Sequence, residues 1–440
     1  MTTTEITTED ARTSSIGLYL AFLQLVFTLL WTTYVIFLPK LAAGVGIPPG
    51  AVILLLMLDQ AVFTVTDTAM GIVADRIAGL VGRLGILVGL MTALSCAAFV
   101  ALPFVASGGA AAKPAFIALI VVWAVTSSAL RAPPLVLLGK YSAQPKIPYL
   151  AALAMLGYGV AGAVAPYLGT LLRDVDARLP FIISSLVLLL TAVGLSRVEY
   201  DAAQHGTIKA PPRRARPLGR VSVIFIVAMM VLSLGYQLHF SINSAPFYLR
   251  FAKADDLPWL LPVFWIGFNL AMFPASRVVK HHGGLIVMGA AGLLGALAII
   301  IAEIAGTLNI LIAAQFIAGA AWGCMLMSAV SAELAIGNGG TEGKVTGLVF
   351  SALALATFAR MAAVAGGMQK LPDYAPLLHW APVACWSVAG AGLLVIAAAR
   401  LQGGRYKRSF RDGPKDQTSD AQLRIGESGD SGFALTRAPE

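Results

Sequence analysis

Six ionisable side chains lie inside stretches of the sequence that are long and otherwise apolar. They are Asp59, Asp67, Arg131, His239, Glu333 and Arg360. A charge placed in the hydrocarbon layer of a membrane costs several kcal/mol unless it faces water or an opposite charge. A carboxylate close to a guanidinium can exchange a proton as the ion pair breaks and forms. These residue types therefore predict ion pairing and proton exchange inside a membrane.

A polar face is expected on the helix that contains His239. Tyr236, His239 and Asn243 follow one another at helical spacing in GYQLHFSINSAPFY, so they lie on one side of a helix. This face fits a lumen better than a packing seam between helices. Asn269 corresponds to Asp67 when the two halves of the chain are superposed at a fixed offset, and it joins the candidates.

The composition is that of a membrane protein. Apolar residues make up 58% of the chain and charged residues only 12%, and the mean hydropathy is +0.81, far above the values of soluble domains. The three cysteines lie apart in apolar runs, so neither a disulfide framework nor a zinc site is expected. The sequence has no phosphate-binding loop, metal cluster or redox motif. We therefore expect no cofactor, no metal and no enzymatic activity.

Twelve apolar runs are long enough to cross the ~30 Å hydrocarbon layer as helices. They cover residues 17–38, 50–73, 83–104, 114–139, 147–172, 179–197, 221–248, 257–277, 284–304, 307–336, 345–368 and 377–400. A long polar connection after the sixth run divides them into two similar halves. The sequence thus predicts an all-α membrane protein with twelve transmembrane helices in two pseudo-symmetric six-helix bundles.

Five parts of the chain follow from these runs. They are a cytoplasmic N-terminal tail (1–16), an N-terminal six-helix bundle (17–197), a cytoplasmic central loop (198–220), a C-terminal six-helix bundle (221–400) and a disordered cytoplasmic tail (401–440). The first apolar run follows an acidic segment and has no cleavage site after it, so we expect it to be retained as a helix.

The positive charges predict the orientation. With the N-terminus inside, 22 of the 31 Lys and Arg residues fall on the cytoplasmic side and seven on the other, as the positive-inside rule requires. Both termini are then cytoplasmic, and the expected location is a plasma membrane, such as a bacterial inner membrane. The net charge of +9 is explained by this bias and by anionic lipid headgroups, so no nucleic-acid partner is expected. Glu333 lies near the inner end of its run, where it fits either an anchor or a functional carboxylate.

A charged corner joins the second and third runs in DTAMGIVADRIAGLVGRLG. Asp75 stands at a helix end, where a carboxylate can accept hydrogen bonds from the positive N-terminus of a neighbouring helix. Arg76 and Arg83 can form ion pairs across the interface between the bundles. Such contacts would hold an inner gate shut. The same charges also fit simple anchors at the membrane surface.

This corner resembles the signature Gly-x-x-x-Asp-Arg-x-Gly-Arg-Arg of the major facilitator superfamily. Gly71, Asp75 and Arg76 match its first part, whereas Gly82 and Arg83 come four residues later than in the common form. The longer spacing is similar to that of the glycoside-pentoside-hexuronide branch, whose Asp-x-x-Met-Gly element is matched by Asp67, Met70 and Gly71. The resemblance implies a gating role for this corner.

The same resemblance implies that the second and eleventh helices flank one side of a central cavity. Arg360 could then pair with Asp59 or Asp67. Asp59 is favoured, because its distance along the helix from Asp75 is similar to that of Arg360 from Lys344. We therefore predict an Asp59–Arg360 ion pair.

These observations predict a secondary active transporter that moves a small organic solute by alternating access, coupled to protons as a symporter. It would act as a monomer in the lipid bilayer. One alternative is drug/proton antiport: Ala165, Pro166 and Gly169 resemble the Gly-Pro-x-x-Gly motif of such antiporters, and Arg131 lies at the depth where they carry an arginine. Another alternative is a receptor or scaffold without transport. Two buried arginines favour an anionic solute, whereas the aromatic and amide side chains suit sugars equally well.

Overall fold

The structure, a computed structural model, describes residues 3–77, 83–141, 146–205, 218–337 and 340–411. The chain divides into two compact units, Met1–Val395 and Ile396–Glu440. The described part of the second unit is the end of one long helix, which stops at Arg411. All candidate residues belong to the first unit.

The described residues are helical almost throughout. Their α-helices are α1 (Thr3–Gly44), α2 (Val52–Ile77), α3 (Arg83–Ala106), α4 (Lys113–Ser127), α5 (Pro133–Tyr141), α6 (Ile147–Leu171), α7 (Arg178–Val193), α8 (Leu195–His205), α9 (Arg220–Leu238), α10 (Ser244–Tyr248), α11 (Leu257–Leu260), α12 (Pro262–His282), α13 (Gly284–Glu303), α14 (Leu308–Ile336), α15 (Glu342–Ala365) and α16 (Ala375–Arg411). Twelve segments built from them are long and apolar enough to cross a membrane. This confirms the predicted number of spans.

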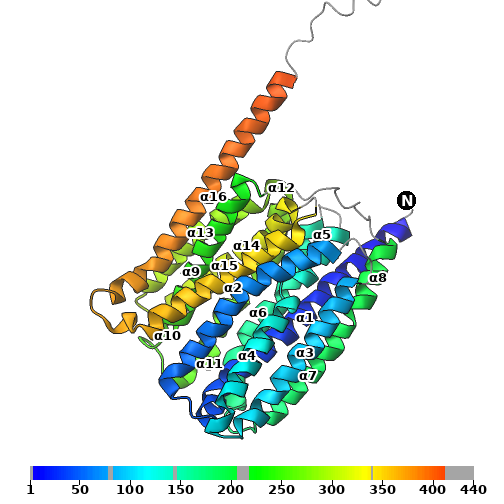
Figure 1. The fold of residues 1–440 in the computed structure, drawn as a ribbon. Coiled ribbons are helices and arrows are strands. Elements are labelled where there is room, and N and C mark those ends of the chain that lie inside the picture. Colours follow the sequence, from blue (N-terminus) through cyan, green and yellow to red (C-terminus); the bar gives the residue numbers. More distant parts are fainter. Residues whose placement is uncertain (1–2, 78–82, 142–145, 206–217, 338–339, 412–440) are drawn as a thin grey trace, which may run out of the picture. The chain divides into compact units, whose positions relative to one another are not determined.

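The helices of the first unit pack in two sets, which contact each other mainly through two pairs of helices. On one side α1 packs against α6 and α7, and α3 against α4 and α7. On the other side α14 packs against α12 and α13, and α9 against α15. The main contacts between these sets are made by α2 with α15 and by α6 with α12, with α6 also touching α14 and α5 touching α15; Figure 1 shows α2 and α15 side by side. The two predicted bundles stay a prediction, and these pairs are where they would meet.

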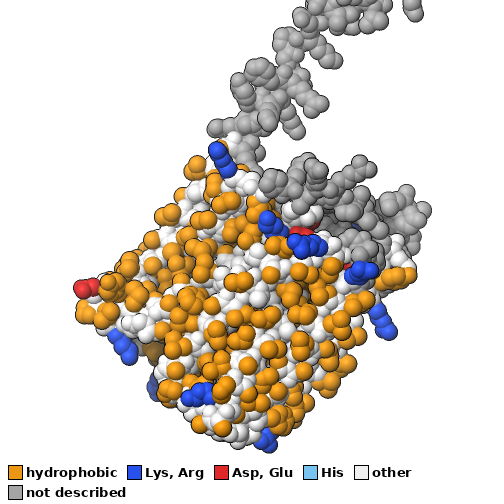
Figure 2. Space-filling model, viewed as in Figure 1, with side chains coloured by type: hydrophobic (Ala, Val, Ile, Leu, Met, Phe, Trp, Pro, Cys, Tyr) orange, Lys and Arg blue, Asp and Glu red, His pale blue; other side chains and the backbone are white. Residues whose placement is uncertain are grey.

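The surface is that of a protein surrounded by lipid. Apolar side chains cover most of the face seen in Figure 2, whereas Lys and Arg gather towards its two ends. Leu90, Leu190 and Val388 lie in the middle of their spans and are 67–72% exposed. Such exposure of large apolar side chains over a wide area is expected only where lipid is the solvent.

Three predicted boundaries differ from the structure. Helix α1 begins at Thr3, so most of the expected tail 1–16 is helical. Helix α8 carries the sixth span on to His205, into the expected loop 198–220. Helix α16 continues to Arg411, although the tail was expected to begin at 401. In each case the helix continues past the end of its apolar run, because polar residues without proline do not stop a helix. Residues 206–217 and 412–440, and with them the predicted disorder, lie outside the described residues.

Two spans are interrupted in their middle, and both interruptions carry candidate residues. The fourth span changes from α4 to a 3-10 turn at Ser128–Leu130 and resumes as α5 at Pro133. Two consecutive prolines at this start cannot donate backbone hydrogen bonds, so the helix breaks before them. The seventh span contains a π-turn at His239–Asn243 between α9 and α10. Such interruptions free backbone groups and are frequent at functional sites.

Candidate functional site

A buried ion pair joins α2 to the break in the fourth span. Arg131 Nη1 lies 3.2 Å from Asp67 Oδ2, with side-chain exposures of 15% and 0%. Asp67 faces this break because it stands on the buried side of α2, and Arg131 closes the 3-10 turn that begins at Ser128. Since the pair has little contact with water, its charges depend on each other.

Aromatic rings from both helix sets surround the guanidinium of Arg131. Its Cζ lies 4.5 Å from the centre of the Phe63 ring on α2 and 5.4 Å from that of Phe350 on α15. The backbone of α15 also reaches Asp67, because a Cβ added at Gly347 would be 2.5 Å from the Asp67 carbonyl oxygen. The ion pair therefore lies where α2 meets α15.

The predicted Asp59–Arg360 ion pair is wrong. Asp59 is fully buried and accepts a hydrogen bond of 2.9 Å from the Tyr34 hydroxyl of α1. Tyr34 packs against Trp123, with ring centres 4.5 Å apart, so the carboxyl group lies in an aromatic cluster of the first helix set. The α2 carboxylate that forms an ion pair with an arginine is Asp67, and its partner is Arg131.

Arg360 lies on α15 beside the phenol of Tyr236 on α9. The two side chains interact electrostatically, and the Arg360 Nε atom is buried without a hydrogen-bond partner. Tyr158 of α6 lies near Tyr236 and packs on Trp265, with ring centres 5.4 Å apart. Tyr158 was missed, although its position between two glycines in the sequence GYG was a signal.

Further aromatic rings form a wall next to Tyr236. The Tyr236 ring stacks on Trp322 at 4.5 Å between centres, and Phe240 lies 5.4 Å from Trp265. Trp265 packs directly on α6, because a Cβ added at Gly162 would be 2.4 Å from its ring. One polar link crosses this region, from the Gln237 amide to Thr357 Oγ1 at 2.9 Å.

The other predicted members of the polar face lie within the second helix set. His239 is fully buried, and its Nε2 atom lies 3.0 Å from Gln315 Oε1 of α14. Asn243 donates a hydrogen bond of 3.1 Å to the His379 carbonyl of α16. Tyr236 points instead towards Tyr158. The predicted common face is therefore divided, because the π-turn changes the angle between successive residues.

Asn269 lies at the contact between α12 and α6. Its amide nitrogen donates to the Trp265 carbonyl at 2.9 Å, and a Cβ added at Gly159 would be 2.3 Å from its Oδ1 atom. Asn269 thus contributes to helix packing as well as being a candidate. Glu333 of α14 is fully buried, which does not fit an anchor at the membrane surface.

The predicted contact of Asp75 with a helix N-terminus is present. Its two carboxylate oxygens accept hydrogen bonds from the backbone N–H groups of Gly343 at 2.6 Å and Lys344 at 2.8 Å. These are free donors in the first turn of α15, and the helix dipole favours a negative charge there. Gly71 allows the approach, because a Cβ at this position would lie 2.0 Å from the Gly343 carbonyl oxygen.

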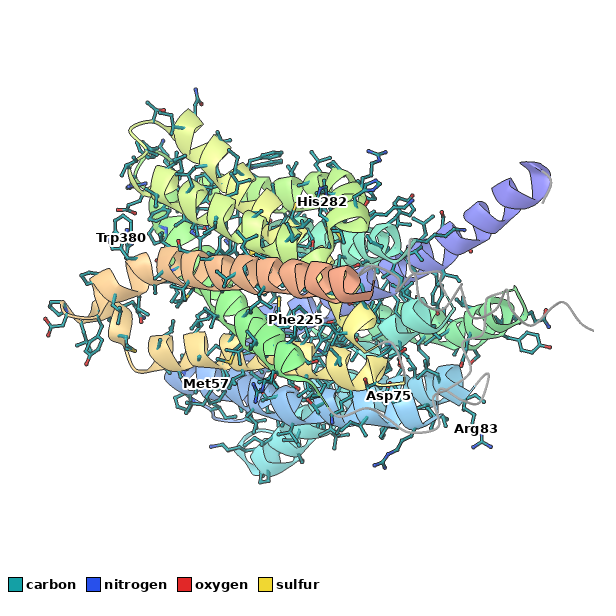
Figure 3. The ribbon with its side chains drawn as sticks, turned by 90° about the horizontal axis from the view of Figure 1, so that it is seen from above. Met57, Asp75, Arg83, Phe225, His282 and Trp380 are labelled. Carbon is teal, nitrogen blue, oxygen red and sulfur yellow. The ribbon has the colours of Figure 1, made fainter. Side chains whose placement is uncertain are left out.

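The arginines of the same corner behave differently. Arg76 and Arg83 are exposed and form no ion pair within the described ranges, so the predicted pairs across the interface are wrong. Figure 3 shows Asp75 beside the start of α15 and Arg83 at the periphery. Exposed arginines at a membrane surface gain more from water and lipid headgroups than from a distant carboxylate. Gly82 lies outside the described residues.

Replacement of Asp75 by asparagine is expected to slow transport. The amide can accept only one of the two backbone hydrogen bonds and loses its charge, which removes about 1.5–3 kcal/mol from the closed contact between α2 and α15. Thermal stability and solute affinity should change little, since the substitution acts on a conformational equilibrium. Turnover at the wild-type rate would leave Asp75 with the role of an anchor.

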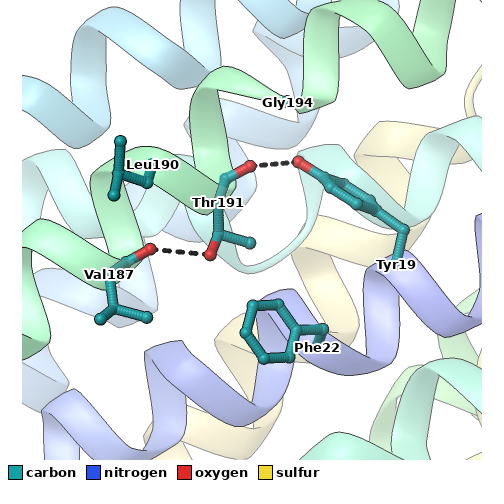
Figure 4. A pocket seen from close by; sticks show the side chains of 6 residues that line it. All are labelled: Tyr19, Phe22, Val187, Leu190, Thr191 and Gly194. Carbon is teal, nitrogen blue, oxygen red and sulfur yellow. Dashed lines mark hydrogen bonds between the residues drawn. The ribbon is translucent and has the colours of Figure 1, made fainter.

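The described residues contain no group of three metal-ligating side chains. A pocket of about 360 Å³ lies between α1 and α7, lined by Tyr19, Phe22, Val187, Leu190, Thr191 and Gly194 (Figure 4). Its one phenol group donates to the Thr191 carbonyl. The Thr191 hydroxyl likewise donates to the Val187 carbonyl, and the pocket contains none of the charged candidates.

A protein-family model decides which family these features belong to. The model of the Major Facilitator Superfamily matches residues 20–359. The chain belongs to the Major Facilitator Superfamily. It is a secondary transporter of this superfamily and not an enzyme. No curated protein is similar enough in sequence to match.

Solved structures of the Major Facilitator Superfamily share its fold. A bacterial homologue of the iron transporter ferroportin in an outward-facing state is 12% identical, with a TM-score of 0.67, covering 87% of this chain and 99% of that one. The human organic anion transporter MFSD10 (TETRAN) is 15% identical, with a TM-score of 0.62 and coverages of 87% and 98%. The proton:xylose symporter XylE is 13% identical, with a TM-score of 0.60 and coverages of 88% and 96%. Such identities establish the fold alone.

Proposed function

We propose that this chain is a proton-coupled symporter that moves a small organic solute by alternating access, with Asp67 and Arg131 as the coupling pair. The observation that carries the proposal is the buried ion pair between α2 and the broken fourth span. It replaces the Asp59–Arg360 pair in the same role. Arg131 also contacts Phe350 of α15. Breaking the ion pair would therefore change contacts in both helix sets.

Coupling follows from competition for Arg131. A proton on Asp67 removes the charge that holds the guanidinium, which is then free to bind an acceptor group of the solute. By thermodynamic linkage, a solute bound to Arg131 favours protonation of Asp67 to the same degree. Proton and solute then cross together, and neither charge stays buried without a partner.

Alternating access requires the two helix sets to separate at the inner end. The contact that closes this end is made by Asp75 with the start of α15 and by the approach of Gly71 to Gly343. Because these groups belong to α2 and α15, their separation would open a path to Asp67 from the predicted cytoplasmic side. We propose that Gly71, Asp75 and the loop with Arg76, Gly82 and Arg83 form this gate.

The test is uptake into proteoliposomes. The purified protein is screened for thermal stabilisation by sugars, amino acids and carboxylates, and the compound with the largest effect is used as a radiolabelled solute. We expect accumulation driven by an acidic exterior and abolished by a protonophore. Asp67→Asn should retain exchange of labelled for unlabelled solute while losing accumulation. If uptake by the wild-type protein does not depend on the pH gradient, proton coupling is ruled out.

The same vesicles separate the alternatives. Solute export driven by the opposite gradient would identify an antiporter, and binding without any flux would identify a receptor. A location in a bacterial inner membrane with both termini cytoplasmic, and a monomeric state, belong to the same proposal. Membership of the glycoside-pentoside-hexuronide branch rests only on Asp67, Met70, Gly71 and the spacing to Gly82.

A further inference from the structure

We propose that the solute is a small organic monoanion whose negative group binds Arg360 and whose apolar body lies against the aromatic wall of Tyr236, Phe240 and Trp265. This inference rests on the proposed transport function and names the class of its substrate. The observation behind it is that Arg131 has a counter-charge, whereas Arg360 has none among the described residues.

The charges between the helix sets are unevenly paired. Arg131 is neutralised by Asp67 at 3.2 Å. Arg360 has no carboxylate within 4.0 Å among the described residues, and its Nε–H group is buried without an acceptor. Asp59, another carboxyl group of α2, accepts a hydrogen bond from Tyr34 of α1. Arg360 is therefore the arginine without a counter-charge among the described residues, and a solute with one negative group can supply it.

A guanidinium without an acceptor is costly inside a membrane protein. It has to be compensated by water, by a protein carboxylate or by a bound anion. The side chain of Arg360 is partly accessible. A carboxylate or a similar planar acceptor could take two parallel hydrogen bonds from it, which a neutral hydroxyl group cannot do.

The neighbours of Arg360 indicate what the rest of the solute is like. Thr357 lies one turn earlier on α15 and is already bonded by Gln237, so these two groups are not free to bind a polyhydroxylated solute fully. The partly exposed Phe240 and the buried Trp265 lie close to Tyr236, with ring centres 5.9 Å and 6.1 Å from it. Aromatic rings pack well on planar or apolar groups. Arg360 with this wall therefore favours an amphipathic anion over a sugar.

The test compares carboxylates with the matching carboxamides, which have nearly the same shape and no charge. Thermal stabilisation of the purified full-length protein is titrated with benzoate and benzamide, phenylacetate and phenylacetamide, and hexanoate and hexanamide. We expect stabilisation by the carboxylate of at least one pair and little by its amide. In Arg360→Gln the apparent affinity for that carboxylate should fall by about tenfold or more, as for the loss of a charge-assisted hydrogen bond.

Two further variants control for charge and for folding. Arg360→Lys keeps the charge and loses the planar fork, so it should retain part of the affinity. Arg178→Gln removes a positive charge from the exposed start of α7 and should bind like the wild type. Equal loss in Arg178→Gln would mean that general attraction of anions, and not a site at Arg360, causes the effect.

The outcomes keep the two proposals apart. Equal binding of the carboxylate and its amide, no binding of any carboxylate, or full binding by Arg360→Gln overturns the monoanion proposal. Uptake of radiolabelled carboxylate in proteoliposomes then tests transport separately. Binding without uptake would support the site and contradict the transport function. Uptake of an uncharged solute that is unchanged in Arg360→Gln would support transport and contradict the site.

Discussion

Replacement of Asp67 by asparagine is expected to destabilise the protein by about 3–5 kcal/mol, the usual cost of leaving one member of a buried ion pair alone. Arg131 would keep its charge in a site where its side chain is only 15% exposed and its other neighbours are the rings of Phe63 and Phe350. Unfolding in detergent, followed by circular dichroism at increasing denaturant, measures the loss.

A double-mutant cycle shows whether the cost belongs to the pair. Arg131→Gln should also be destabilising, and the double variant should be much less so than the sum of the two, because no charge is then left unpaired. Asp256→Asn is the matched control, since Asp256 is exposed and accepts a backbone hydrogen bond in a loop. Strictly additive losses for Asp67 and Arg131 would remove the ion pair from both the stability and the coupling argument.

Valine in place of Gly71 is expected to hold the inner gate open and to stop transport. Its Cβ would lie 2.0 Å from the Gly343 carbonyl oxygen and 2.8 Å from the carbonyl carbon, so α2 and α15 cannot keep their contact. Because these helices belong to different sets, the clash can be relieved by separating the sets. The measurement is labelling of Ser351→Cys, a buried position on α15, by a maleimide that does not cross membranes. We expect faster labelling from the side on which Asp75 lies.

Gly157 supplies the control for this experiment. A Cβ there would be 1.7 Å from the Ala21 carbonyl oxygen, an equally severe clash, but between α1 and α6 of the same helix set. Gly157→Val should therefore lower the yield of folded protein without opening the gate. Slow labelling of Ser351→Cys in Gly71→Val, together with normal transport, would show that the inner end is closed by other contacts.

The number of spans and the contact of Asp75 could be predicted because each depends on a local pattern. A run of apolar residues is sufficient to predict a span, and a carboxylate at a helix end needs only a nearby helix N-terminus. The partner of Arg360 could not be found in the same way. The number of residues between two positions gives their difference in depth along a helix, and depth favoured Asp59 as the partner of Arg360. That number does not give the direction in which the side chain points.

The break in the fourth span explains why Asp67, and not Asp59, forms an ion pair with an arginine, which is Arg131. Arg131 lies at a 3-10 turn before two prolines, where helical spacing no longer gives either its depth or its direction. The π-turn in the seventh span has a similar effect on His239 and Asn243. In both spans the predicted helix is continuous, whereas the structure breaks it before two prolines in the fourth span and at the π-turn in the seventh. The residues at these turns are the ones whose neighbours were not predicted.

The contact between α2 and α15 also affects how readily the transporter can cycle. At Gly71, Gly343 and Gly347 the backbones of α2 and α15 come into direct contact. Glycine has no rotamers to lose, so these three positions add no side-chain entropy cost when α2 and α15 come together. Each time α2 and α15 come together, no side-chain rotamer has to be selected at these glycines. Larger residues here would add both a clash and an ordering step, which would be repeated at every turnover.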